Sequence, residues 1–349
     1  METYRVFEPN VVNELARKHQ HTFKALGEIE ELLNGRFSDM KEPIHALILA
    51  VASGEPLLFV GPPGTAKSRL IRVFCDLAGL IDLNKLQNGA NSEESSDYFE
   101  YLLTPFTEPG ELFGYYEIIE GERSRHLERK EEGMMQKAKV VYLDEVFNGS
   151  SAILNSILAF VNERVFHDRG QRKKVALQVL FGATNDVPQT RELRAIYDRF
   201  LLRCEVNNAQ EEKQQIKALL EKGWRETYSI HTRKPHRGLL DDLEKFRDDL
   251  KQETSQGRLK VTMDDKFLGY LTQRVSHIRR MDLSDMSNRR LIKMLNVMLI
   301  HAMYMAVSTN HLNQGITFSD EQLNLLRFAQ DRRDELVEES LKYRDAELS

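Results

Sequence analysis

At residues 57–68 the chain reads Leu57-Leu58-Phe59-Val60-Gly61-Pro62-Pro63-Gly64-Thr65-Ala66-Lys67-Ser68. The first four residues form a short, wholly apolar run, which is typical of a strand buried in a parallel sheet. A Gly/Pro turn follows, and the pattern from Lys67 to about Ala78 predicts a helix. A buried strand, a tight loop and a helix in direct succession indicate an α/β fold.

The loop in this stretch predicts a phosphate site. Residues 61–68 match the pattern G-x-x-x-x-G-K-S except at the second glycine position. Backbone N–H groups and the positive end of the helix would surround a phosphate, and Lys67 would reach the β and γ oxygens. Ser68 would supply a hydroxyl group to Mg²⁺.

Ala66 is the residue that departs from the pattern. A methyl group is tolerable there if φ is negative and the position is already helical, because only a positive φ demands glycine. The alternative is an ordinary Gly/Pro turn, but the strand before the loop and the helix after it favour nucleotide binding. The predicted nucleotide-binding residues of the loop are Gly61, Pro62, Pro63, Gly64, Thr65, Ala66, Lys67, Ser68 and Arg69.

Other segments extend the α/β pattern. Three later apolar runs resemble the first strand, at residues 140–143, 179–183 and 201–206. Residues 151–163 place their apolar side chains on one helical face, and residues 11–34 and 43–52 also read as helices. Apolar strands that alternate with helices indicate a mostly parallel sheet covered on both faces.

Two acidic residues follow one of these strands directly. Asp144 stands at the carboxyl end of the run 140–143, where an open α/β sheet places its ligand, and Glu145 comes next. Asp144 would hold Mg²⁺ through water, and Glu145 would orient and polarise the attacking water. Adjacent acids are often only solvated loop residues. In a chain with a phosphate loop they favour a hydrolytic site.

A third polar position follows the run 179–183, which continues as Thr184-Asn185-Asp186. Asn185 would lie at the lip of the sheet, where it could sense the γ-phosphate or position water. The alternative is that Asn-Asp only opens a turn before Pro188. The other two motifs favour the functional interpretation.

Composition restricts the class of protein further. Hydrophobic residues make up 41% of the 349 residues and charged residues 30%, which excludes a disordered chain and a disulfide scaffold. The net charge of −5 argues against tight nonspecific binding to nucleic acid. Cys75 and Cys204 stand alone and fit a reducing compartment. With no secretory signal and no long apolar run, we expect a cytoplasmic protein without membrane insertion.

The composition changes after Val206. Residues 207–263 are rich in charged residues and glutamine, and an amphipathic helix follows near residues 291–305. We therefore expect an α/β domain over residues 1–206 and a smaller all-helical domain over 207–320. Residues 321–349 read as a charged terminal helix.

These motifs together resemble the AAA+ ATPases, and more narrowly the RavA-like branch of the MoxR family. Beyond the loop and the Asp-Glu strand, the resemblance lies in Phe99-Glu100-Tyr101-Leu102-Leu103-Thr104, Glu111-Leu112-Phe113-Gly114, Ala152-Ile153-Leu154-Asn155, Val161-Asn162-Glu163-Arg164, Ala195-Ile196-Tyr197-Asp198-Arg199-Phe200 and Ser287-Asn288-Arg289-Arg290. It extends from about residue 12 to 310. It implies a P-loop domain with a mostly parallel five-stranded sheet flanked by helices, followed by an all-helical lid.

The resemblance also assigns roles to two arginines. Arg199 matches the arginine finger, which reaches the γ-phosphate bound by the neighbouring subunit, and Arg203 is close enough to be an alternative. Arg289 matches the second sensor, in the lid. The family reads Ser-Pro-Arg-Ala there, so Arg290 is a second possibility. A finger supplied in trans implies that activity requires a ring.

Two hairpins are expected from the same resemblance, at residues 114–133 and 165–177. In the family both approach the central face of the ring. The basic residues in them could contact an acidic client segment, although charges in turns are usually only solvated. These residues are Arg123, Arg125, Arg169, Arg172, Lys173 and Lys174.

The resemblance finally implies ATP and Mg²⁺ as cofactors, a homo-hexameric ring, and a partner with a von Willebrand factor A (vWA) domain. The predicted function is ATP hydrolysis coupled to chaperone-like remodelling of a protein. Two alternatives stay open, a nucleic-acid-dependent motor and a nucleotide-gated scaffold with slow hydrolysis. No basic stripe with interleaved aromatic residues supports the first, and Glu145 and Arg199 argue against the second.

Overall fold

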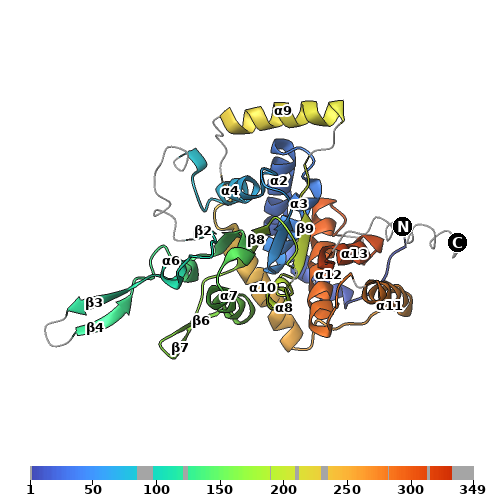
Figure 1. Cartoon of the computed structure of the whole chain (residues 1–349). Helices are drawn as coiled ribbons and strands as arrows, with labels where there is room; N and C mark the ends of the chain where they lie inside the picture. Colours follow the sequence, from blue (N-terminus) through green and yellow to red (C-terminus); the bar gives the residue numbers. More distant parts are fainter. Residues whose placement is uncertain are drawn as a thin grey trace.

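Five parallel strands form the centre of the molecule (Figure 1). Their order across the sheet is β2 (Tyr98–Leu102), β5 (Val140–Asp144), β8 (Val179–Thr184), β1 (Leu57–Val60) and β9 (Leu202–Glu205). Every neighbouring pair in this sheet is parallel. The computed structural model describes residues 2–84, 97–120, 125–188, 190–208, 212–228, 235–281, 283–312 and 315–331. The α/β fold class expected from the alternating strands and helices is confirmed.

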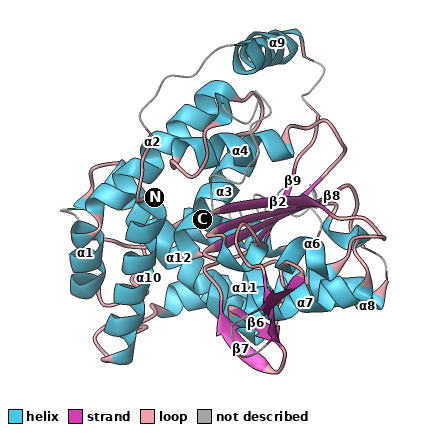
Figure 2. Ribbon diagram, turned by 90° about the vertical axis from the view of Figure 1, so that its left-hand side faces the viewer, coloured by secondary structure: helices cyan, strands magenta, loops and turns pink. Residues whose placement is uncertain are grey.

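The strands alternate their side chains between two cores, as the period of a β-strand requires. Leu57 and Phe59 belong to one core, while Leu58 belongs to the other. The first core is covered by α2 (Gln20–Arg36), α3 (Lys41–Ser53) and α4 (Lys67–Leu77). The second is covered by α6 (Pro109–Phe113), α7 (Ser151–Glu163) and α8 (Arg191–Tyr197). Figure 2 shows α2 and α4 above the strands and α7 below them.

The expected helix over residues 11–34 is wrong in one respect, because it is two helices. α1 (Pro9–Lys18) ends at His19 and α2 starts at the next residue. His19 is buried, its Nε2 lies 2.6 Å from Asp249 Oδ2, and its ring packs edge-on against Phe246. The break is therefore accompanied by contacts with a distant helix, which the local apolar pattern does not contain.

The described part of the chain after the sheet is mainly helical. Its elements are α9 (Lys213–Tyr228), α10 (Leu239–Ser255), α11 (Asp265–Arg280), α12 (Asn288–Ser308), α13 (Asp320–Asn324) and the 3₁₀ turn η5 (Leu325–Ala329). Apolar residues of α10, α11 and α12 join the same core that α2 and α3 cover. Residues 332–349 of the expected terminal helix lie outside the described residues. The domain boundary at residue 206 stays a prediction.

The long helix α12 is apolar enough, by length and composition alone, to cross a membrane. It packs against α2 and α3, and 56% of its most apolar window is buried in the protein. Its apolar residues are thus accounted for by the core.

Antiparallel hairpins lie at both expected places. One consists of β3 (Tyr116–Glu120) and β4 (Arg125–Arg129) and projects from the body in Figure 1. The other consists of β6 (Val165–Asp168) and β7 (Gln171–Lys174). Asp168 joins them, because its carboxylate accepts hydrogen bonds from the Tyr116 hydroxyl and from Arg129 Nε.

Several basic hairpin residues are already paired within the chain. Lys173 Nζ lies 2.8 Å from Glu131 Oε1 and 3.0 Å from Asp168 Oδ2. Arg172 pairs with Glu163, and Arg169 donates to the carbonyl of Leu127. Arg123 lies outside the described residues, as does the side chain of Arg125, and Lys174 is exposed. Client contact by these residues stays a prediction.

Candidate nucleotide-binding and hydrolysis site

The three polar motifs predicted from the sequence meet at one edge of the sheet. Val60 pairs with Thr184, and Leu143 pairs with Gly182. Residues that follow these strands are therefore neighbours, and Gly61 N donates a 3.0 Å hydrogen bond to the carbonyl of Thr184. This is the carboxyl edge of a parallel sheet, the place where open α/β folds bind ligands.

The phosphate loop folds around the amino group of Lys67. Lys67 is buried, and its Nζ donates to the carbonyl oxygens of Gly61 at 2.6 Å and Pro62 at 2.8 Å. The Thr65 hydroxyl donates to the same Pro62 carbonyl at 2.9 Å. The ammonium group thus lies inside the loop, and α4 begins at Lys67 with no acidic residue in its first turn. Both features suit a negatively charged ligand.

The condition under which an alanine would be tolerated without strain at position 66, a negative φ, is not met. Ala66 has φ 61° and ψ 21°, the left-handed conformation, and immediately precedes the first residue of α4. Such a conformation costs a non-glycine residue roughly 1–2 kcal/mol. The loop therefore keeps the left-handed turn for which the usual glycine is suited, and the alanine is strained.

Gly61 meets a different restriction. A Cβ atom on Gly61 would lie 2.0 Å from the carbonyl oxygen of Val206, the residue after β9. The first glycine of the loop is thus needed for the close approach of two strand ends. Gly64 has φ 82° and no heavy atom within 4 Å of its hypothetical Cβ, so only its backbone conformation favours glycine.

The acidic pair and Asn185 form a connected group. Asn185 Nδ2 donates a 2.7 Å hydrogen bond to Glu145 Oε1, and Glu145 N donates a 3.0 Å bond to Asp144 Oδ1. Glu145 has φ 50°, so it too is left-handed. Asn148 Nδ2 lies 3.5 Å from the second carboxylate oxygen of Glu145. One oxygen of the Glu145 carboxylate is thus held by Asn185, the other has only a weak contact, and the residue lies in a strained turn, a feature often found at functional sites.

Electrostatics couple this group to the loop. Burial lowers the pKa of Lys67, and the negative charges of Asp144 and Glu145 oppose this effect. Burial, followed by the charge of Asp144, raises the pKa of Glu145, while Lys67 and the Asn185 hydrogen bond lower it. Lys67 and the two carboxylates therefore lie close enough for their charges to interact.

The oxygen-bearing side chains of the site suit a magnesium ion. Ser68 and Asp144 are both half-buried, at the start of α4 and at the end of β5. Mg²⁺ prefers oxygen ligands and commonly takes only one or two from the protein, together with phosphate oxygens and water. The described ranges contain no group of three or more His, Cys, Asp or Glu residues placed to hold a metal by themselves. The residues therefore fit a magnesium site in which phosphate oxygens and water would supply most of the ligands.

Comparisons with known families agree with this geometry. The model of the MoxR domain in the MoxR-vWA-beta-propeller ternary systems matches residues 24–247, more than half of the chain. The chain belongs to the MoxR family. The match covers the phosphate loop, the Asp-Glu pair and Asn185 of this MoxR domain.

Individual relatives add less about function. Two uncharacterized proteins of Methanocaldococcus jannaschii are each 39% identical over 178 residues, which cover 51% of the chain and 43% of the relative. A structural protein of Acidianus two-tailed virus is 29% identical over 180 residues, covering 51% of the chain and 26% of that protein. The chain therefore spans less than half the length of these relatives.

A solved structure shares the fold. The crystal structure of a "putative ATPase" from Cytophaga hutchinsonii matches with a TM-score of 0.60 and 15% sequence identity. The match covers 90% of this chain and 87% of the other. At this identity it shows a common architecture, an α/β sheet with a helical region after it.

The two finger candidates of this MoxR domain lie in opposite environments. Arg199 is exposed and forms no hydrogen bond or ion pair through its side chain with the described residues. Arg203 is 4% exposed and pairs with Asp198 and Asp331. Only Arg199 is free to reach another molecule.

The two lid candidates differ in the same way. Arg289, near the start of α12, is exposed. Arg290 is 7% exposed and donates to Ser284 Oγ and to the carbonyls of Ala329 and Asp198. The sequence pattern did not identify Asp331 as a partner of this region, since no motif surrounds it.

Arg69, the last residue of the predicted binding set, points toward α9. Its Nη2 lies 2.8 Å from Glu226 Oε1 and also donates to the Glu226 carbonyl. The start of α4 is therefore linked to the first helix after the sheet. In this arrangement the guanidinium group is engaged by protein oxygens.

Proposed function

We propose that this MoxR domain binds ATP and hydrolyses it. The observation that carries the proposal is the meeting of Lys67, Asp144, Glu145 and Asn185 at the carboxyl edge of the sheet. A buried cation inside a phosphate loop, beside a held carboxylate, is the arrangement needed to bind a polyphosphate and activate water.

Each side chain has a role that its surroundings support. Lys67 would leave the loop carbonyls and bind the phosphate oxygens. Glu145 would accept a proton from water, and Asn185 would hold one oxygen of that carboxylate in place, as its 2.7 Å hydrogen bond suggests. Ser68 and Asp144 would hold Mg²⁺, which would neutralise charge on the phosphates when bound.

We also propose that activity depends on self-assembly into a ring. Arg199 lies on the surface without a partner among the described residues, as a finger that serves a neighbouring subunit would. A finger in trans contributes roughly 10³–10⁵ in rate. For the lid sensor we propose Arg289, because Arg290 is buried and hydrogen-bonded to the carbonyl of Asp198. A hexamer is the assembly that the family resemblance suggests.

The partner proposed for this domain is a protein with a vWA domain. The description of the matching family model, which names MoxR, vWA and beta-propeller components, supports this proposal. Chaperone-like remodelling of that partner and membership of the RavA-like branch are finer proposals, which rest on the resemblance alone. A cytoplasmic location is supported by two cysteines that are buried and unpaired.

The decisive experiment is ATP turnover as a function of protein concentration, with Glu145→Gln and Arg199→Ala beside the parent chain. We expect specific activity to rise with concentration and both variants to lose turnover while binding ATP. An Arg289→Ala variant tests the lid sensor in the same assay. A parent chain that binds ATP without turnover at any concentration, and also with an added vWA domain, would contradict the proposed hydrolysis.

A further inference from the structure

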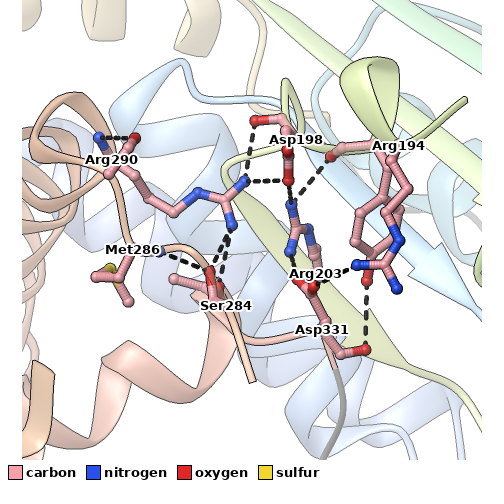
Figure 3. Close-up of polar contacts among 10 residues, drawn as sticks. Arg194, Asp198, Arg203, Ser284, Met286, Arg290 and Asp331 are labelled. Atoms are coloured by element: carbon pink, nitrogen blue, oxygen red, sulfur yellow. Dashed lines mark hydrogen bonds and ion pairs between the residues drawn. The ribbon is translucent and has the colours of Figure 1, made fainter. Parts of the chain in front are cut away.

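A cluster of charges, with two buried arginines at its centre, lies beside the exposed Arg199. It consists of Asp198, Arg203, Arg290 and Asp331, and Figure 3 shows the four side chains converging with Ser284 and Arg194 at its margin. The four residues come from three separate parts of the chain: the end of α8 and β9, the first turn of α12, and the segment after η5. Residues up to 133 positions apart in the sequence therefore meet in this cluster.

Arg290 links the start of α12 to the loop that carries Arg199. Its Nη2 donates a 2.9 Å hydrogen bond to the carbonyl of Asp198 and lies 3.6 Å from the Asp198 carboxylate. Its Nη1 donates to Ser284 Oγ at 3.0 Å and to the carbonyl of Ala329 at 3.2 Å. One guanidinium group thus bridges three segments, which a planar group with several donors is suited to do.

Asp331 anchors the same loop from the other side. Its carboxylate pairs with Arg203 Nη1, and its carbonyl accepts a 3.3 Å hydrogen bond from the Tyr197 hydroxyl. Its own backbone N–H donates to the carbonyl of Leu283 at 2.6 Å. Arg203 in turn donates from Nη2 to the carbonyl of Tyr197 and to Asp198 Oδ1, both at 3.1 Å.

These contacts converge on the residues just before Arg199. Tyr197 and Asp198 are held by Arg203, Arg290 and Asp331, and the Arg203 guanidinium also stacks 3.8 Å from the centre of the Tyr197 ring. On the other side, Phe200 is buried so tightly that a Cβ on Gly182 would lie 2.8 Å from its ring. The backbone of Arg199 is fixed at both ends while its side chain stays exposed.

The cluster is costly to form, which argues that its geometry matters. Arg203 and Arg290 are 4% and 7% exposed, and buried ion pairs often stabilise a protein no more than apolar residues of the same size would. Burial, followed by the nearby Arg203 charge, lowers the pKa of Arg290 to about 10. Burial likewise raises the pKa of Asp331.

We propose that Arg290 and Asp331 are positioning residues for the arginine finger: through Asp198, Tyr197 and Arg203 they fix the loop from which Arg199 reaches the neighbouring subunit. This inference rests on the proposed function, since it presupposes a finger in trans. It means that a shift of α12 or of the segment after η5 changes the rate of hydrolysis in the next subunit rather than in its own.

The test uses turnover, ATP affinity and subunit mixing in the full chain. Asp331→Asn removes the charge that faces Arg203 but keeps the shape of the side chain. Arg290→Lys keeps the charge of Arg290 but puts one nitrogen in place of the two Nη atoms that bond to Ser284, Ala329 and Asp198. Asp285→Asn is the matched control, because Asp285 is exposed in the neighbouring loop and its side chain has no partner in the described part of the chain.

We expect turnover of Asp331→Asn and Arg290→Lys to fall by about 10²-fold, the loss that a displacement of about 1 Å can cause, with ATP affinity unchanged. Asp285→Asn should keep parental turnover. Mixing Asp331→Asn or Arg290→Lys subunits with Glu145→Gln subunits should restore turnover. In the mixed ring, an intact hydrolysis site of one subunit can meet an intact finger of its neighbour. With random mixing, about one interface in four combines the two intact parts.

Subunit mixing distinguishes a failure of the positioning role from a failure of the finger in trans. If Arg199→Ala is restored by Glu145→Gln subunits but Asp331→Asn and Arg290→Lys are not, the cluster acts on its own subunit and the proposal is overturned. Parental turnover in both cluster variants would also overturn it. If Arg199→Ala itself keeps full turnover, the finger in trans is wrong, and the positioning role falls with that part of the proposed function.

Discussion

The side-chain amide of Asn185, the residue after β8, donates a 2.7 Å hydrogen bond to Oε1 of Glu145, the residue after β5. The two strands are neighbours in the sheet, so the contact is made by residues 40 positions apart in sequence. It leaves the second carboxylate oxygen directed toward Asn148 at 3.5 Å, a weak contact. One oxygen of the proposed base is therefore held while the other is nearly free to take a proton.

Removing that hydrogen bond should slow hydrolysis without weakening ATP binding. For Asn185→Ala we expect kcat to fall by about 10–10²-fold, because an unrestrained carboxylate loses its orientation toward water. The KM for ATP should stay within about threefold of the parent value. Steady-state kinetics measure both, and Asn148→Ala is the control, with a much smaller loss. A large rise in KM for Asn185→Ala would mean that Asn185 binds substrate instead.

The pH dependence of hydrolysis should report the carboxyl group of Glu145. Burial and then Asp144 raise its pKa above the ordinary value, and a general base acts only when ionised. Turnover should therefore fall as the pH is lowered through this raised pKa, at a higher pH than an ordinary glutamate, near 4.3, would give. Asn185→Asp places a further negative charge beside Glu145 and should move the acid limb to still higher pH. An unchanged limb in Asn185→Asp would assign the titration to another group.

The glycines of the phosphate loop should differ in their tolerance of alanine. Gly61→Ala forces a Cβ against the Val206 carbonyl, so we expect the free energy of unfolding to fall by about 1–3 kcal/mol and ATP affinity to be lost. In Gly64→Ala the new Cβ contacts no atom, so only the positive φ destabilises the folded state, by about 1–2 kcal/mol. The stiffer unfolded chain of the alanine variant partly offsets this loss. Urea unfolding and ATP titration measure both quantities. Equal losses in the two variants would contradict the contact at Val206.

Ala66→Gly should relieve strain in the loop. The native φ of 61° disfavours alanine by roughly 1–2 kcal/mol, while glycine adds about 0.4–1 kcal/mol of unfolded-state entropy. The free energy of unfolding should therefore stay constant or rise by up to about 1 kcal/mol. Ala25→Gly, inside α2, is the matched control and should lose about 0.5–1 kcal/mol. A comparable loss in Ala66→Gly would show that the left-handed turn is not adopted.

Substitution of the two finger candidates should affect the free energy of unfolding to different extents. Arg203→Met leaves Asp331 without its buried partner and should cost about 3–5 kcal/mol in the free energy of unfolding. Arg199→Met changes an exposed side chain and should stay within about 0.5 kcal/mol of the parent while losing turnover. Urea unfolding beside an ATPase assay distinguishes them. A stable Arg203→Met variant would contradict the buried pair with Asp331, and Arg203 would be the finger instead if that variant lost turnover while Arg199→Met kept it.

Much of the fold was predictable because its signals are local. The run Leu57–Val60 is apolar throughout, since both of its faces are buried, and the loop after it carries a recognisable spacing. The Asp-Glu pair was assigned to the site from its place after a buried strand. Parallel strands bring their carboxyl ends to the same edge, so this inference needed no knowledge of individual contacts.

Other features escaped the sequence because they depend on partners far along the chain. The break between α1 and α2 coincides with contacts from His19 to Asp249 and Phe246, and no helical pattern encodes such contacts. The sign of φ at Ala66 stayed open because a single alanine does not fix its own backbone conformation, and the structure gives a positive value. Asp331 has no motif around it, and its importance comes only from the arginines it meets.

The sequence by itself determined the α/β class, the phosphate loop and the identity of the two acidic residues, because those follow from periodicity and spacing within a few residues. It left Arg199 against Arg203 and Arg289 against Arg290 undecided, since both members of each pair carry the same charge within a few positions. Only the tertiary structure separated them. Burial and ion pairing place Arg203 and Arg290 inside the protein and leave Arg199 and Arg289 on its surface, and both properties depend on how distant segments pack.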